Sequence, residues 1–168
     1  MKIWKKTIVL ACVVFFSNYV FAKNIVFSCV QNIQAPENSD KISYIIEDSI
    51  FSSLFDAGLI VGNIPIRSNE ESILENIAVV NKQLENKSEY ILLIKIDYAK
   101  EPFVDRQTEE KVPHVEKMHY ILFDVDKNKI LYEKSLRIAK TKTKKDLVRK
   151  LEKENKKIME AVTKKVKS

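Results

Sequence analysis

The 168-residue sequence is poor in the residues from which most catalytic sites are built: it has two glycines, two histidines and two cysteines. Gly58 and Gly62 are too few to form the glycine-rich loop that cradles a phosphate, and no Gly-x-Ser-x-Gly nucleophile motif occurs. His114 and His119 are five residues apart, which places them on opposite faces of a strand, where they do not converge on one metal. The sequence therefore predicts a non-enzymatic protein with no cofactor and no metal site.

The cysteine content limits the role of disulfides. Cys12 lies in the N-terminal apolar segment, and Cys29 lies in "NIVFSCV", residues 24–30. If the N-terminal segment is removed, Cys29 has no partner within the chain, so stability must come from a hydrophobic core. Cys29 is expected to be a small, buried strand residue. A disulfide between the Cys29 side chains of two copies is the alternative.

The first 22 residues have the three parts of a secretory signal peptide. Three lysines precede a mainly apolar run at residues 7–21, and Val20 and Ala22 supply the small residues expected before a cleavage site at Lys23. The sequence thus predicts a mature chain of residues 23–168 in the periplasm or envelope. An uncleaved membrane anchor is the alternative. A lipoprotein signal ending at Cys12 is rejected, because the apolar run before that residue is too short.

Hydrophobic periodicity predicts one mixed α/β (α+β) domain at residues 23–168, with helices packed on a single sheet. The expected elements, in the order β-α-β-α-β-β-β-α, are a strand at 24–30, a helix at 39–57, a short strand ending at 62, a helix from about 68 to 87, a strand at 89–99, strands at 115–126 and 129–139, and a helix at about 144–167. Gly58 is expected to end the first helix, and Ser68 with Glu71 to form a capping box for the second.

Charge is segregated along the chain. Residues 23–133 carry 12 basic and 19 acidic residues, whereas residues 134–168 carry 14 basic and 4 acidic residues. The C-terminal helix has an apolar stripe of Leu147, Leu151, Ile158, Val162 and Val166, which is expected to dock it on the sheet. Its remaining surface is rich in lysine, and the candidate anion-binding residues are Lys156, Lys157, Lys164 and Lys165. The basic face has little aromatic interleaving, so no nucleic acid partner is expected.

A charged segment at residues 100–113, bounded by Pro102 and Pro113, is the longest connection in the expected fold. Connections of this length are often functional. The candidate partner-binding residues in it are Glu101, Phe103, Asp105, Arg106, Glu109 and Glu110. An exposed sheet edge is a second candidate, because an extended segment of a partner can pair with it. Deletion of residues 101–112 is expected to abolish partner capture and to leave thermal unfolding intact.

The segment "FDVDKNK", residues 123–129, begins like a calcium-binding EF-hand loop, with Asp124, Asp126 and Asn128 at alternate positions. Such a loop needs glycine at its sixth position and a bidentate glutamate at its twelfth, and these positions hold Lys129 and Ser135. The flanking residues alternate as strands do, and asparagine tolerates the left-handed backbone of a tight turn. The segment is therefore predicted to be the turn of a β-hairpin.

This hairpin, "FDVDKNKILY" at residues 123–132, resembles the "D-V-x-T-G-x-V-L-W" hairpin of small bacterial envelope domains, the group that includes the TolB amino-terminal domain, LpoB and CsgG. "SEYILLIKI" at residues 88–96 and "DAGLIV" at 56–61 are similar to other segments of that group. The sequence departs from the pattern at Asn128, where the group has glycine, and at Lys95. The resemblance implies a shared fold and no catalytic residues.

Together these features predict an exported, non-enzymatic envelope or periplasmic protein that acts as a protein-binding adaptor or assembly factor. The expected partners are envelope proteins. The alternative is a protein that binds a polyanion or an anionic membrane surface through the basic C-terminal helix, in which case the ligand is an anionic lipid or an envelope polymer.

Overall fold

The computed structural model describes residues 22–69, 72–84 and 87–168, and it has the mixed α/β fold that the sequence predicts. The elements, in chain order, are β1 (Asn24–Gln31), α2 (Ser39–Asp56), β2 (Ile60–Ser68), α3 (Ile73–Gln83), β3 (Tyr90–Tyr98), β4 (Phe103–Val104), β5 (Lys111–Val112), β6 (Val115–Asp124), β7 (Lys129–Arg137) and α4 (Lys144–Lys167). The main elements follow the predicted order. The short strands β4 and β5 were not predicted. The predicted signal peptide lies almost wholly outside the described residues.

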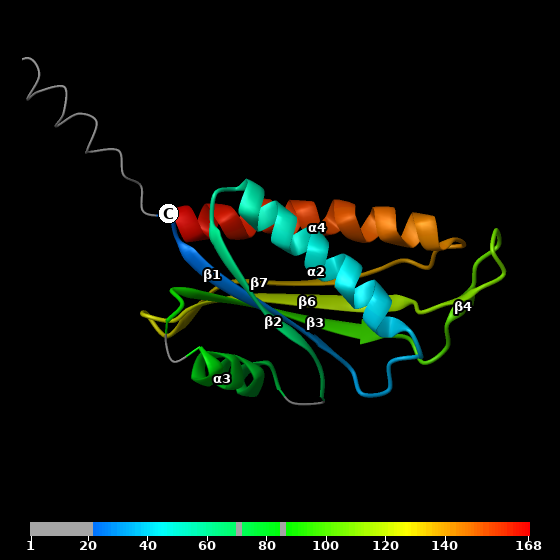
Figure 1. Cartoon of the computed structure of the whole chain (residues 1–168), viewed down its shortest axis with the longest axis horizontal. Coiled ribbons are helices and arrows are strands. Elements are labelled where there is room, and N and C mark those ends of the chain that lie inside the picture. Colours follow the sequence, from blue (N-terminus) through cyan, green and yellow to red (C-terminus); the bar gives the residue numbers. More distant parts are fainter. Residues whose placement is uncertain (1–21, 70–71, 85–86) are drawn as a thin grey trace, which may run out of the picture.

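The main sheet has the strand order β2-β1-β3-β6-β7. β1 runs parallel to both β2 and β3, whereas β6 is antiparallel to β3 and β7 is antiparallel to β6. Helices α2 and α3 lie in the crossovers between parallel strands, where such connections usually carry a helix. Figure 1 shows α2 and α4 side by side on one face of the sheet and α3 on the opposite face.

Two hydrophobic clusters hold the layers together. The larger lies between the sheet and the helices α2 and α4, and it includes the fully buried Phe27, Leu92 and Leu122. The smaller lies under α3. The described residues of the two clusters extend from Ile25 to Val166. β3 is apolar on both of its faces because it contributes to both clusters, as its nearly continuous hydrophobic run predicted.

Gly58 ends α2 as predicted. Its φ of +78° lies in the left-handed region, where glycine is favoured. The Gly58 N–H donates to the carbonyl of Phe55 at 2.8 Å, and the Leu59 N–H donates to the carbonyl of Leu54 at 3.3 Å. This pair of hydrogen bonds is the Schellman motif, and the burial of both Leu54 and Leu59 supplies its hydrophobic contact.

The start of α3 differs from the prediction. The capping box is made by Ser72 and Glu75: the Glu75 N–H donates to the Ser72 hydroxyl, and the Ser72 N–H donates to the Glu75 carboxylate at 2.7 Å. The predicted pair was Ser68 with Glu71. Ser68 instead ends β2, which continues past Gly62 because it pairs with β1 over nearly its full length. Glu71 lies outside the described residues.

β2 and β7 are the two edge strands of the main sheet. In β2, Pro65 and Ile66 lie opposite the single residue Cys29 of β1, so the edge strand contains a β-bulge at its proline. Proline has no N–H to donate to a β-ladder, and it is tolerated here because it lies at a bulge of an edge strand. β7 has a bulge at Leu131, close to the turn, and pairs regularly with β6 from Tyr132 to Arg137.

Candidate functional site

Residues 100–113 form an ordered projection that we call the arm. β4 and β5 pair within it, Phe103 with Val112 and Val104 with Lys111. Figure 1 shows the arm extending past the end of the main sheet. The sequence predicted a charged loop at this place, because strands of two residues leave no periodic pattern to detect.

Asp105 fixes the arm to the first turn of α4. One carboxylate oxygen accepts a hydrogen bond from the Lys144 N–H at 2.5 Å, and the other accepts one from the Gln107 N–H at 2.7 Å. The Arg106 N–H also donates to the Lys142 carbonyl at 3.2 Å. The bonds from the Lys144 and Gln107 amides hold the pKa of Asp105 below its usual range. Asp105 is therefore a buried anchor that satisfies an unpaired amide of the helix start.

The six residues proposed from the sequence as a partner surface divide into two groups. Phe103 is half-buried and packs edge-on against the His114 ring at a centroid distance of 6.2 Å, so it anchors the arm as Asp105 does. The other four, Glu101, Arg106, Glu109 and Glu110, are exposed. Val104 is 58% exposed beside them, and the sequence did not single it out. The exposed part of the arm thus combines one apolar side chain with charges of both signs.

A cavity of about 230 Å³ lies at the base of the arm. His114 and Thr141 are among its lining residues, and His114 Nδ1 and Thr141 Oγ1 are buried without a hydrogen-bond partner among the described residues. Burial lowers the pKa of His114, and the nearby positive charges of Lys140 and Lys150 lower it further. The folded protein therefore favours the neutral imidazole.

Acid is expected to destabilise the protein through His114. Because its folded pKa lies below the unfolded value of about 6.5, the unfolded chain binds more protons, and stability is lost as the pH falls from that value towards the folded pKa. Glu47 acts in the opposite direction, because burial raises its pKa. We expect His114→Leu to lose less thermal stability than the wild type between pH 7 and pH 5. Equal slopes in a melting series would contradict this assignment.

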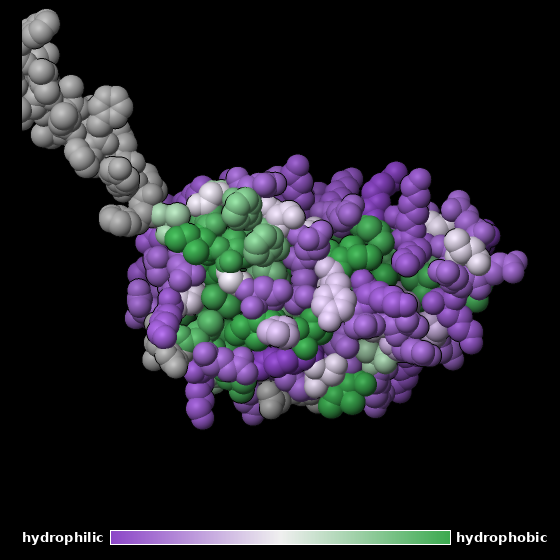
Figure 2. Space-filling model, in the orientation of Figure 1, coloured by the Kyte–Doolittle hydropathy of each residue, from purple (hydrophilic) through white to green (hydrophobic). Residues whose placement is uncertain are grey.

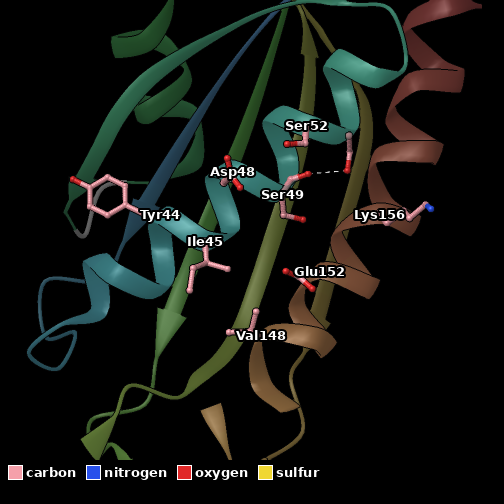
Figure 3. Close-up of a pocket in the computed structure, with 9 residues that line it drawn as sticks. Tyr44, Ile45, Asp48, Ser49, Ser52, Val148, Glu152 and Lys156 are labelled. Carbon is pink, nitrogen blue, oxygen red and sulfur yellow. Dashed lines mark hydrogen bonds between the residues drawn. The ribbon is translucent and has the colours of Figure 1, made fainter. Parts of the chain in front are cut away.

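A groove of about 650 Å³ runs between α2 and α4 (Figure 3). Glu152 of α4 points towards α2, whereas the ring of Tyr44 projects from the other side of α2 and the side chain of Lys156, which also lines the groove, extends away from α2. The Ser53 hydroxyl donates to the Ser49 carbonyl of the preceding turn at 2.7 Å, so it is engaged by the helix backbone. The groove thus has hydrogen-bonding side chains, and within the described part of the chain none of its serines forms a hydrogen bond with Asp48 or Glu152.

Helix α4 begins and ends where predicted, and its apolar stripe is buried against α2 and the sheet. All four candidate anion-binding lysines are exposed. Lys157 forms an ion pair with Glu154 at 2.9 Å, and Lys165 lies in the last turn of the helix. Lys156 and Lys164 line a second cavity, of about 520 Å³, between α4 and the end of α2. The four lysines do not converge on one point, because they are spread over three turns of the helix.

Asn155 is a polar residue within the apolar face of α4, and sequence analysis did not identify it. It is fully buried, and its Oδ1 accepts a hydrogen bond from the Tyr120 hydroxyl of β6 at 2.5 Å. Burial raises the pKa of Tyr120, which keeps the phenol protonated. The sequence did contain a signal for this buried contact, because an asparagine stands where the apolar stripe of the helix would otherwise continue.

The β6–β7 hairpin is confirmed at residues 124–129. The Asp124 carboxylate accepts hydrogen bonds from the Lys127 N–H at 2.9 Å and from the Lys127 ammonium at 3.0 Å. Asn128 has a φ of +48°, the left-handed conformation expected of it. Asp124 is thus used by the turn itself, with Lys127 as its partner.

The fold accounts for the environments of Cys29 and His119. Cys29 is fully buried, as predicted, and burial raises the pKa of its thiol. His119 Nε2 lies 2.9 Å from the Glu133 carboxylate of the neighbouring strand.

Within residues 22–69, 72–84 and 87–168, no group of three or more His, Cys, Asp and Glu side chains is placed to hold a metal. None of the helices in those ranges is long and apolar enough to cross a bilayer.

Comparison with known proteins gives one family match, weak structural likenesses and no match among curated proteins. A family model described as "Uncharacterised protein" matches residues 24–167. The PelC dodecamer from Paraburkholderia phytofirmans is 13% identical, with 86% of this chain and 87% of that chain covered and a TM-score of 0.41. TolB from Acinetobacter baumannii is 13% identical over 86% of this chain and 28% of that chain, with a TM-score of 0.42. Lipoprotein GNA1162 from Neisseria meningitidis is 15% identical over 87% of this chain and 99% of that chain, with a TM-score of 0.41.

TolB, one of the proteins named for the hairpin motif, is among these structures. Membership of the narrower TolB, LpoB and CsgG group stays a prediction. Because the TM-scores lie below 0.5, no function is transferred from these structures to this chain.

Proposed function

The chain belongs to the family described as "Uncharacterised protein", whose model matches residues 24–167, and we propose that it is an exported, non-enzymatic envelope protein that binds other envelope proteins as an adaptor or assembly factor. The observation that carries the proposal is the arm. Its anchored half holds the exposed half in one conformation beyond the sheet, where a partner can reach it.

The anchoring of the arm supports a binding role on energetic grounds. Ordering a flexible loop during association opposes binding, so a loop that is already ordered binds with a smaller entropic penalty. Asp105 and Phe103 provide that order through α4 and the core. An exposed apolar residue surrounded by charges, as Val104 is, has the composition of a small protein contact.

Three side chains that could serve acid–base chemistry are not paired with one another, which supports a role other than catalysis. Ser53 is bonded to its own helix, His119 is bonded to Glu133, and His114 packs against Phe103. None of the three forms a nucleophile–base pair with another.

The arm can be tested with the paired substitutions Val104→Asp and Arg106→Glu. They change exposed side chains and leave Phe103 and Asp105 in place, so we expect the melting temperature to stay within about 2 °C of the wild type. Partner capture by crosslinking in the native envelope should fall at least about tenfold, because loss of a central apolar contact typically costs more than 1 kcal/mol. The matched control is Leu74→Asp with Lys82→Glu on α3, on the opposite face of the sheet. Equal capture by the arm variant and the control would overturn the proposal.

Deletion of residues 101–112 is a poorer experiment than the sequence suggested. It removes the Asp105 hydrogen bond to the start of α4 and the Phe103 contact with the core. We therefore expect the deletion to lower thermal stability, and a loss of capture would then have two explanations. Substitution of exposed arm residues separates binding from folding.

A further inference from the structure

We propose that one end of the molecule, the end at which the chain enters the fold, is a contact surface for an anionic phospholipid bilayer. We call it the entry end and define it by residues 23–24, 55–60, 87–90, 124–130 and 163–168. The inference is independent of the arm, which projects from the opposite end of the sheet (Figure 1).

Hydrogen bonds join the segments of the entry end. The Ile60 N–H donates to the carbonyl of Lys23 at 2.9 Å, and the Lys167 ammonium donates to the carbonyl of Ala57 at 2.6 Å. The Val125 N–H donates to the Glu89 carbonyl at 3.0 Å, and the Asn24 side chain donates to the Lys87 carbonyl at 3.2 Å. The starts of β1 and β2, the ends of α2 and α4 and the β6–β7 turn therefore form one continuous surface.

Two large apolar side chains are exposed on this surface. Phe55 is 62% exposed and Ile60 is 57% exposed. They flank the Schellman turn at Gly58, where the chain leaves α2 and starts β2, and Phe55 stacks on Phe51 of the preceding turn at a centroid distance of 6.0 Å. Figure 2 shows apolar residues gathered at this end, beside the point where the described chain begins. Exposed aromatic and aliphatic residues of this kind can enter the interfacial region of a bilayer.

Positive charge surrounds these side chains. The segments of the entry end contain seven lysines and four carboxylates. Glu89 and Asp124 are already paired with lysines, at 2.9 and 3.0 Å. Lys164 and Lys165 are exposed in the last turn of α4. Lysines close to an anionic leaflet each contribute about 1 kcal/mol of attraction, so the charge on this end is complementary to anionic headgroups.

The position of the preceding residues identifies a bilayer as the occupant. Residues 1–21 continue from this end of the fold, and residues 7–21 are the apolar run predicted to enter the membrane as a signal peptide or an anchor. While that segment remains attached, its junction with Lys23 keeps the entry end near the bilayer. The exposed apolar pair and the lysines then face the surface from which the chain emerges.

The proposal is tested by vesicle co-sedimentation of the segment 23–168. This segment is the predicted mature chain, and we expect it to fold on its own because it contains all of the described residues of both hydrophobic clusters. Vesicles of phosphatidylglycerol and phosphatidylcholine (3:7) are compared with pure phosphatidylcholine at low and high salt. We expect binding only to the anionic vesicles, and weaker binding at high salt because the attraction is screened.

Variants test whether the binding surface lies at the entry end. Lys164→Gln with Lys165→Gln should lower the partition coefficient about thirtyfold, and Phe55→Ser with Ile60→Ser should lower it about tenfold. The matched controls are Lys145→Gln with Arg149→Gln, at the other end of α4, and Leu74→Ser on α3. Both controls should bind as the wild type does. The proposal is overturned by absence of binding to anionic vesicles at low salt, by equal binding to neutral vesicles, or by equal losses in the lysine variant and its control.

Discussion

A chain that carries Leu151→Asp is expected to lose a large part of its stability and to melt far below the wild type. Leu151 is buried in the cluster between α4, α2 and the sheet. An unpaired carboxylate at this position would have to be desolvated without a partner, and such substitutions destabilise by more than about 4 kcal/mol, a large part of the 5–15 kcal/mol that stabilises a typical domain. Circular dichroism would show that the helical signal is lost at a much lower temperature than in the wild type.

The matched control is Lys153→Asp, two residues further along the same helix, where the side chain is exposed. It introduces the same carboxylate and should change the free energy of unfolding by no more than about 0.5 kcal/mol. Leu151→Ala should fall between the two, with a loss of about 2–5 kcal/mol. If Leu151→Asp melted like the wild type, α4 would not belong to the core, and the lysine-rich helix would have to be treated as a separate surface element.

The second large effect is expected from the buried hydrogen bond between Tyr120 and Asn155. Tyr120→Phe removes the donor to Asn155 Oδ1, and Asn155 Nδ2 already has no partner among the described residues. An amide left unsatisfied inside the core costs about 1–3 kcal/mol, so the single variant should lose that amount in a urea titration. Asn155→Leu should also be destabilising, because the remaining partner of the phenol within the described ranges is then the Met118 sulfur at 3.4 Å.

The double variant Tyr120→Phe with Asn155→Leu should recover most of the lost stability, because it leaves no polar atom of the pair unsatisfied. The coupling energy from the double-mutant cycle is then about 0.5–3 kcal/mol. Additive losses in the cycle would show that the two side chains act independently and that the short contact does not stabilise the fold.

The sequence predicts those parts of the fold that depend on local periodicity. The heptad-like spacing from Leu147 to Val166 predicts the bounds of α4, and the apolar run around Leu92 predicts the central strand. Gly58 and Asn128 are identified because few residues adopt the left-handed backbone of a helix end or tight turn. In each case the signal lies within a few residues of the feature.

Features that depend on distant contacts are not predictable in this way. Asp105 is an anchor because it meets Lys144, 39 positions away along the chain. Its charge suggested an exposed contact, and only the fold shows why it is buried. The displaced capping box of α3 has a similar cause, since pairing with β1 extends β2 through Ser68 and takes that residue away from the helix.

The same distinction between local signals and distant contacts applies to the candidate surfaces. The exposed lysines of α4 were identified from composition, and the exposed half of the arm from its length and charge. The entry end combines residues from five separate segments, so no single stretch of sequence reveals it. Val104 was missed for a different reason: an isolated valine in a charged segment is as typical of a covered position as of an exposed one.

The proline and bulge in β2 make the two edges of the sheet unequal in their capacity to grow. An added strand needs a straight row of free amide and carbonyl groups, and Pro65 with the bulge beside it interrupts that row on one side. β7 keeps a regular stretch from Tyr132 to Arg137. We therefore expect strand addition to favour the β7 edge, while the bulge and proline of β2 oppose the open-ended stacking that leads to fibres.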